Sequence, residues 1–167
     1  MLCSPLLLNR DGGGAGWELD RHVDELGRTL GEELLEPTRI YAKACLALAR
    51  ETRTHAMSHI TGGGLAANLE RVLPEEVSVR IDRGTWTPQP VFKLVQEVGR
   101  VAQADLERTL NLGVGMVALV AADDVNRVLS ALEDHGVQSW VCGEVAMADG
   151  TGRAGGTVTL EGSHPGW

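Results

Sequence analysis

The sequence predicts a domain of mixed helices and strands. Its 167 residues fall within the usual size of one domain. Apolar residues make up 43% and aromatic residues only 4%, so the core must consist mainly of Ala, Val, Leu and Ile. Segments with helical spacing of apolar residues alternate with short runs of period two. We divide the chain into a lead-in over residues 1–36, a core over 37–147 and a Gly-rich tail over 148–167 that includes an edge strand.

The core is predicted to begin with a helix. Residues 19–35, ahead of it, are polar and interrupted by glycines, which indicates helical turns on a surface. Pro37 is expected to open the helix, because its missing N–H costs nothing at the first helical position. Ile40, Ala44 and Leu48 then recur at every fourth residue and predict one apolar face.

A strand, a glycine loop, a helix and a second strand are predicted next. Residues 55–61 alternate imperfectly and end at three glycines. Apolar residues over 65–73 have helical spacing until Pro74 ends the helix. Apolar and polar residues alternate over 77–82, which is typical of a half-buried strand.

The second half of the core repeats these patterns. Pro88 and Pro90 introduce a helix, and residues 102–110 form another. Residues 116–121 are an apolar run, typical of a central strand covered on both faces. After them we expect a helix capped by Asp123 or Asp124 and ended by Gly136, then an extended segment over 138–147 and an edge strand over 157–160.

Charge and cysteine content exclude several classes of protein. Fifteen Lys and Arg against 23 Asp and Glu give a net charge of −8, which argues against a nucleic-acid partner. No segment has the features of a signal peptide or a membrane span. Cys3, Cys45 and Cys142 are odd in number and widely spaced, which fits a reducing compartment, with Cys45 and Cys142 as core thiols. We expect a cytoplasmic protein that binds neither nucleic acid nor membrane.

The first candidate site is the glycine loop formed by Thr61, Gly62, Gly63 and Gly64. Glycines allow a ligand to approach the backbone closely, and the N–H groups at the start of the next helix attract an anion such as phosphate. The alternative is a tight strand-to-helix turn that needs positive φ. The residues alone leave both interpretations open.

The second candidate is the segment Asn111-Leu112-Gly113-Val114-Gly115 ahead of an apolar strand. Gly113 and Gly115 would let another chain or a ligand approach the strand entrance, whereas the simpler interpretation is a β-bulge. His59 could face the same cleft or be a structural residue. Arg39 could bind an anion or form a surface pair with Glu36. We assign no catalytic residue and no metal ligand.

Four segments, taken in order, resemble the C-terminal half of aminoimidazole ribonucleotide synthetase, also called phosphoribosylformylglycinamidine cyclo-ligase. They are LLEPTRIY at 34–41, HITGGGL at 59–65, RVLP at 71–74 and NLGVGM at 111–116. Each glycine motif is common by itself, but the combination is specific. The resemblance runs from about residue 19 to residue 148.

The resemblance implies an α+β fold with a central sheet of about four main strands flanked by helices. It implies an ATP-dependent ligase of de novo purine biosynthesis that closes formylglycinamidine ribonucleotide to aminoimidazole ribonucleotide, with ATP and Mg²⁺ in the intact enzyme. Positioning and charge stabilisation dominate such catalysis. On this basis the expected substrate and phosphate site comprises Arg39, His59, Thr61, Gly62, Gly63, Gly64, Asn111, Gly113 and Gly115.

The family's chains are longer, and the N-terminal half that handles ATP and metal has no counterpart in this sequence. We therefore expect this chain to hold neither ATP nor Mg²⁺ by itself, to be inactive alone and to work with an N-terminal half. The alternative is a non-catalytic remnant that binds another chain, or a second copy, through the face that such a half would cover.

Overall fold

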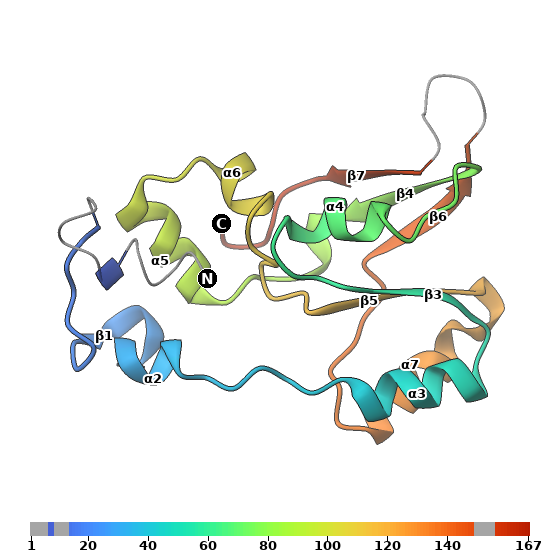
Figure 1. The fold of residues 1–167 in the computed structure, drawn as a ribbon, viewed down its shortest axis with the longest axis horizontal. Helices are drawn as coiled ribbons and strands as arrows, with labels where there is room; N and C mark the ends of the chain where they lie inside the picture. Colours follow the sequence, from blue (N-terminus) through green and yellow to red (C-terminus); the bar gives the residue numbers. More distant parts are fainter. Residues whose placement is uncertain (1–6, 9–13, 149–155) are drawn as a thin grey trace.

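The computed structural model describes residues 7–8, 14–148 and 156–167, and it has the predicted α+β character (Figure 1). In chain order its elements are β1 (His22–Val23), η1 (Asp24–Leu26), β2 (Arg28–Thr29), α2 (Leu30–Leu34), α3 (Ala42–Glu51), β3 (Thr54–His59), α4 (Gly64–Glu70), β4 (Val77–Asp82), η2 (Arg83–Thr85), α5 (Pro90–Gly99), α6 (Gln103–Glu107), β5 (Met116–Val120), η3 (Ala122–Asp124), α7 (Val125–Asp134), β6 (Gly143–Met147) and β7 (Thr157–Glu161).

The four predicted main strands are divided between two sheets. Strands β3 and β5 form an antiparallel pair, and β4 lies between β6 and β7 in a second sheet. Strand β7 runs parallel to β4 and is an edge strand, as predicted. The expectation that residues 116–121 form a central strand is wrong, because among the described strands β5 pairs only with β3. Strand β4 is the central strand, with Val79 and Ile81 buried on one face and Ser78 on the other.

Two clusters of buried apolar side chains hold these elements together. The first joins the N-terminal residues to α5 and α6 and consists of Leu7, Val23, Leu30, Val91, Leu94, Val95, Leu106 and Leu112. The second lies between α4 and the two sheets and consists of Ile60, Leu65, Leu69, Val79, Ile81, Val114 and Val117. Only Leu, Ile and Val form them, as the composition indicated. The lead-in therefore belongs to a core, and the segment around Gly113 joins one cluster to the other.

The helix predicted from Pro37 begins five residues later, at Ala42, so this boundary is wrong. Arg39 donates to the Gly136 carbonyl, and Tyr41 packs against Gly115 and His59. These contacts hold the chain off the helical path before Ala42, in the extended connection below the body of the molecule in Figure 1. Ile40 is 86% exposed, so the apolar stripe begins only at Ala44.

Helix α7 has the predicted limits, but its N-terminal cap differs. Asp124 is the N-cap residue, yet its carboxylate accepts the backbone N–H of Arg53 at 2.6 Å instead of capping its own helix. Gly136 follows the helix with φ 66°, and its N–H bonds to the carbonyl of Glu133, as predicted for a left-handed end. Cys3 lies outside the described residues. Most of the Gly-rich stretch that follows Ala148 lies outside them too.

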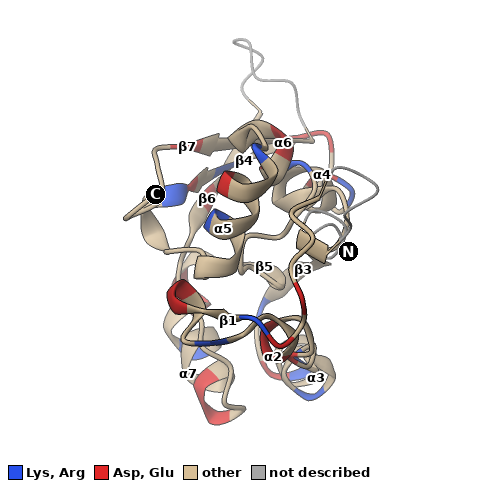
Figure 2. Ribbon diagram, turned by 90° about the vertical axis from the view of Figure 1, so that its left-hand side faces the viewer, with Lys and Arg blue, Asp and Glu red and all other residues tan. Residues whose placement is uncertain are grey.

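Basic and acidic residues are interspersed along the described chain, as the ribbon in Figure 2 shows. Exposed pairs such as Arg28 with Glu36 and Arg53 with Asp123 join opposite charges locally. None of the described helices is long and apolar enough to cross a membrane.

Candidate functional site

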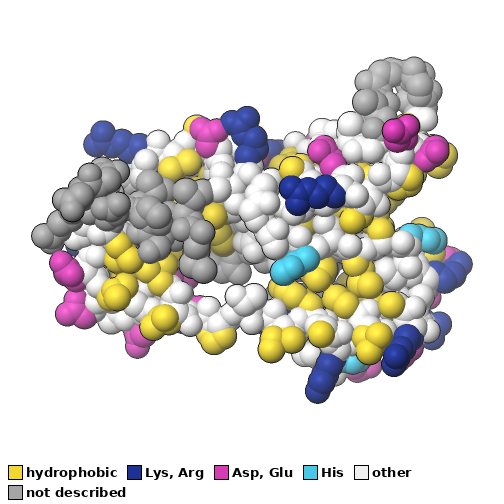
Figure 3. All heavy atoms as spheres, viewed as in Figure 1, with side chains coloured by type: hydrophobic (Ala, Val, Ile, Leu, Met, Phe, Trp, Pro, Cys, Tyr) yellow, Lys and Arg dark blue, Asp and Glu magenta, His cyan; other side chains and the backbone are white. Residues whose placement is uncertain are grey.

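A groove of about 1470 Å³ lies along β5. Its walls come from the connection before α3, from the segment between β4 and α5, from α7 and from the residues that lead into β6. Figure 3 shows apolar side chains gathered over β3, β5 and the start of α3 on this side of the molecule. Five of the nine predicted site residues line the groove, namely Arg39, His59, Asn111, Gly113 and Gly115.

Tyr41 connects three of these predictions. Its ring meets the ring of His59 edge to face, with the centroids 6.1 Å apart. A Cβ atom on Gly115 would lie 2.0 Å from the Tyr41 hydroxyl oxygen, so only glycine permits this approach. Arg39, nearby in the chain, donates to the carbonyl of Gly136 at 3.3 Å. The pair predicted between Arg39 and Glu36 is wrong, because Glu36 binds Arg28 instead.

The segment over residues 111–115, hereafter the 111–115 loop, is a turn and not the β-bulge of the simpler interpretation. Leu112 has φ 47° and Gly113 φ 90°. The Val114 N–H bonds to the Asn111 carbonyl at 3.0 Å, and the Gly113 N–H bonds to the Asn111 side chain at 3.2 Å. A Cβ atom on Gly113 would lie 2.3 Å from the side-chain oxygen of Gln89. The glycines therefore admit other segments of this chain, and the approach of a ligand or of another chain stays a prediction.

The loop over residues 61–64, hereafter the 61–64 loop, lies outside the described lining of the groove. Gly63 has φ 105° and Gly64 φ 73°, which confirms a strand-to-helix turn that needs glycine. A Cβ atom on Gly64 would lie 1.7 Å from the carbonyl oxygen of Glu107, whereas one on Gly62 would meet no atom within 4 Å. Gly64 therefore has a packing role, and Gly62 has free space around it.

Asn68 holds the 61–64 loop and was missed by the sequence reasoning. It is 4% exposed, and its side-chain N–H groups donate to the carbonyls of Thr61, Gly62 and Gly64 at 3.3, 3.2 and 2.7 Å. Its side-chain oxygen accepts from the Thr61 hydroxyl at 3.3 Å. An amide in an otherwise apolar helical pattern, four residues after the last loop glycine, was the available signal.

The guanidinium beside this loop belongs to Arg71. Arg71 donates to the Asn68 side-chain oxygen at 3.1 Å, and a Cβ atom on Gly63 would lie 3.7 Å from its terminal nitrogen. Thr61, Gly62 and Arg71 are exposed. Arg39 lines the groove, and its predicted association with the glycines of this loop stays a prediction.

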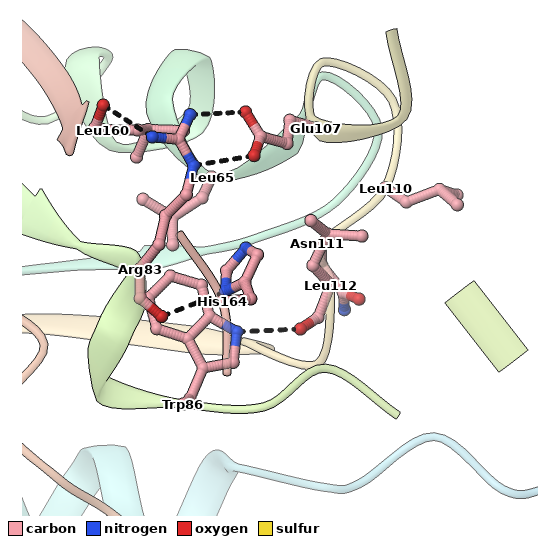
Figure 4. A pocket seen from close by; sticks show the side chains of 9 residues that line it. All are labelled: Leu65, Arg83, Trp86, Glu107, Leu110, Asn111, Leu112, Leu160 and His164. Atoms are coloured by element: carbon pink, nitrogen blue, oxygen red, sulfur yellow. Dashed lines mark hydrogen bonds and ion pairs between the residues drawn. The ribbon is translucent and has the colours of Figure 1, made fainter. Parts of the chain in front are cut away.

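A second, small pocket next to both loops is shown in Figure 4. Arg83 and Glu107 form a two-fold hydrogen-bonded ion pair there, with both contacts at 2.7 Å and side chains only 17% and 10% exposed. Burial would raise the pKa of the Glu107 carboxyl, but hydrogen bonds from Arg83 and Gln103 outweigh it and lower that pKa. His164 lies beside the pair, and burial lowers its pKa.

The two described cysteines, Cys45 and Cys142, are partly buried and free. Burial raises the pKa of the Cys142 thiol, which makes it a poor nucleophile. The prediction of core thiols is therefore met only in part, because neither side chain is fully buried.

Comparison with known proteins identifies the family. Residues 4–154 match the family described as AIR synthase related protein, C-terminal domain. The chain belongs to this family. Among curated relatives, the putative phosphoribosylformylglycinamidine cyclo-ligase of Streptomyces fradiae is 54% identical over 90% of this chain and 83% of that protein.

Longer relatives in the AIR synthase related group carry the same name. The phosphoribosylformylglycinamidine cyclo-ligases of Symbiobacterium thermophilum and Pseudothermotoga lettingae are 45% and 41% identical over 89% and 79% of this chain. This chain spans only 42% and 39% of their lengths. The family match includes all nine predicted site residues but not residues 156–167, which contribute β7 and His164.

Proposed function

We propose that this chain is the substrate-binding C-terminal domain of a phosphoribosylformylglycinamidine cyclo-ligase. The reaction would be the ATP-dependent closure of formylglycinamidine ribonucleotide to aminoimidazole ribonucleotide, in purine biosynthesis. Family membership and the names of the relatives support the reaction. One observation carries the substrate-binding role: residues from three of the four resembling segments, 34–41, 59–65 and 111–116, meet in one groove.

The groove offers the chemistry that such a substrate needs. The Arg39 guanidinium, the His59 imidazole and the Tyr41 hydroxyl provide donors for ribose and amide oxygens, and the Asn111 carboxamide can both donate and accept. The apolar side chains of β5 form one wall and exclude water. A site of this kind accelerates ring closure by holding the two reacting groups of one substrate in contact.

The 61–64 loop is our proposed site for the substrate phosphate. The N–H groups of Gly62 and Gly63 make no hydrogen bond with any described residue, and the Arg71 guanidinium lies beside them. Backbone N–H groups and arginine are both good phosphate ligands. Thr61 follows His59 by two residues, so their Cα atoms are at most about 7 Å apart and one substrate can reach both.

We propose that ATP and Mg²⁺ are held by a part of the intact enzyme outside this chain. The residues that the structure describes include no group of three or more His, Cys, Asp or Glu able to hold a metal ion. They therefore do not fit Mg²⁺, which prefers carboxylate and phosphate oxygens. On this proposal the chain is inactive alone.

A second polypeptide is the proposed partner, either the remaining part of a full-length enzyme or another copy. Trp140, Val141, Val145 and Met147 are 36–70% exposed at the groove and along β6, and such apolar surface is typical of an interface. A purely non-catalytic module is not favoured, because the relatives are named as cyclo-ligases. Light scattering that shows only a monomer would count against self-association.

Binding of formylglycinamidine ribonucleotide, measured by calorimetry, tests the phosphate assignment. Arg71→Gln and Gly62→Ala should each weaken binding by about tenfold, because one removes a cation and the other adds a methyl group where the ligand approaches. Arg127→Gln, on the exposed side of α7, is the matched control and should bind as the wild type does. Unchanged affinity in both loop variants would contradict the assignment.

Reconstitution tests the reaction itself. The chain, mixed with the separately produced N-terminal part of a full-length relative, should convert substrate in an ATP-dependent manner. Neither part should do so alone. Turnover by the isolated chain would refute its proposed dependence on another part, and its absence in the mixture, despite complex formation, would refute the proposed reaction.

A further inference from the structure

The last residues of the chain are fixed to its core although they lie beyond the family match. Arg83 donates to the carbonyl of Leu160 at 2.7 Å, and Lys93 donates to that of Gly166 at 3.2 Å. The Trp167 indole N–H donates to the Gln96 side chain at 2.7 Å. The residues after β7 are therefore held from both η2 and α5.

His164 is the buried centre of this segment. It is 4% exposed, and its Nδ1 lies 3.1 Å from the Arg83 carbonyl oxygen, so this nitrogen carries the proton and donates. The imidazole meets the Trp86 ring edge to face, at 4.5 Å between centroids and 68° between planes (Figure 4). The position of the Trp86 indole thus depends on the imidazole.

Trp86 in turn holds the 111–115 loop. Its indole N–H donates to the carbonyl of Leu112 at 3.1 Å. Leu112 has φ 47°, which is costly for a residue with a side chain and persists only where its surroundings enforce it. The indole hydrogen bond and the burial of the Leu112 side chain in the first core cluster supply that enforcement.

We propose that His164 is a positioning residue for the 111–115 loop, acting through Trp86. The neutral imidazole keeps the indole N–H directed at Leu112, and this preserves the turn that presents Asn111 to the groove. The importance of this contact for substrate binding rests on the proposed function, but the contact itself does not.

Proton uptake by His164 would disturb this arrangement. The charged groups that act on it are Glu107 of α6 and Arg83 of η2. Burial, the largest influence, lowers its pKa below the usual 6.5. The folded state therefore favours the neutral form, and its stabilisation is present at neutral pH and is lost as the pH falls from about 6.5 through the lowered value.

Nuclear magnetic resonance of the whole chain tests the proposal without any ligand. We expect amide exchange at Gly113 and Val114, and exchange of the Trp86 indole N–H, to rise by about tenfold between pH 7.5 and pH 5 after correction for intrinsic rates. In His164→Phe, which keeps an aromatic ring against Trp86, this pH dependence should disappear. His164→Ala should show fast exchange in the loop already at pH 7.5.

His135→Ala is the matched control, since His135 is exposed at the end of α7. In this variant, hydrogen exchange in the 111–115 loop should depend on pH as it does in the wild type. The proposal is overturned if wild-type exchange in the loop does not change with pH, or if His164→Phe retains the change. It is also overturned if exchange in β3 and β5 rises as much as in the loop, because the effect would then be global. The exchange measurement uses no substrate, so its outcome does not depend on whether the chain binds the proposed substrate. The positioning role of His164 and the proposed function can therefore be refuted independently.

Discussion

The two loops are both rich in glycine, but their glycines have different structural roles. In the 61–64 loop, Gly64 admits the carbonyl of Glu107, whereas Gly62 has no neighbour within 4 Å. In the 111–115 loop, Gly113 and Gly115 each admit a side chain, from Gln89 and Tyr41. A glycine surrounded by protein atoms is needed for packing, whereas a glycine with free space around it can be contacted by a ligand from solvent. Gly62 is therefore the position where ligand contact can be tested without disturbing the fold.

Gly64→Ala should have the largest effect of the substitutions considered. The new Cβ would lie 1.7 Å from a backbone oxygen, at a φ of 73° that alanine tolerates poorly. We expect a loss of about 3 kcal/mol or more in the free energy of unfolding, measured by urea denaturation. Gly62→Ala should change it by less than about 0.5 kcal/mol. Equal effects at the two positions would remove the distinction between these glycines.

The Arg83–Glu107 pair lies in the small pocket next to both loops, and its loss should destabilise the fold. Glu107→Gln leaves the Arg83 guanidinium buried without a counter-charge, at a cost of about 3 kcal/mol. Because the pKa of Glu107 is lowered, its contribution is present above about pH 4.5 and is lost as the pH falls further. The free energies of unfolding of wild type and variant, measured by urea denaturation from pH 7 to pH 3, should therefore become equal at low pH. Glu133→Gln, an exposed control, should be as stable as the wild type. A stability difference between wild type and Glu107→Gln that grows towards low pH would contradict the assignment.

Asn68→Ala should act on the 61–64 loop alone. It removes a side chain that donates to three loop carbonyls, which we expect to cost about 2 kcal/mol. Hydrogen exchange should accelerate over the 61–64 loop and remain unchanged over the 111–115 loop. Asn126→Ala on α7 is the control. Faster hydrogen exchange in both loops would mean that the stability of the 111–115 loop also depends on Asn68.

Gly115→Ala should cost less than the substitutions at Gly64, Glu107 and Asn68. Its Cβ would meet the end of the Tyr41 side chain, which can rotate, so we expect a cost of about 1 kcal/mol. Combined with Tyr41→Ala, the same substitution should cost nothing further in a double-mutant cycle. A cost that persists in the absence of the tyrosine would show that Gly115 is needed for the backbone and not for this contact.

Local pattern was sufficient for much of the fold. The alternation over 77–82 predicts β4, and the apolar run at 116–121 predicts β5, because strand period is a property of adjacent residues. The pattern could not place Pro37, since Arg39 and Tyr41 leave the helical path for contacts with Gly136 and Gly115. Nor could it show that β5 is paired on one side only.

The candidate site, like the fold, was predicted where local motifs define it and missed where tertiary contacts do. The motifs located both loops, and five residues they named do meet in the groove. Asn68 and Arg71 were missed, because neither belongs to a glycine motif and both act on the 61–64 loop from the following helical region. His164 was missed because it lies beyond the resembling segments and reaches the 111–115 loop only through Trp86.

The sequence by itself determined the α+β class, a core of Ala, Val, Leu and Ile, the strand and helix periods, and the family. All of these follow from composition and from residues close together in the chain. Tertiary structure decided which glycine admits which neighbour, which arginine lies beside the 61–64 loop and how the last residues hold the 111–115 loop. Those contacts join segments far apart in sequence, and their distances depend on how the two core clusters pack.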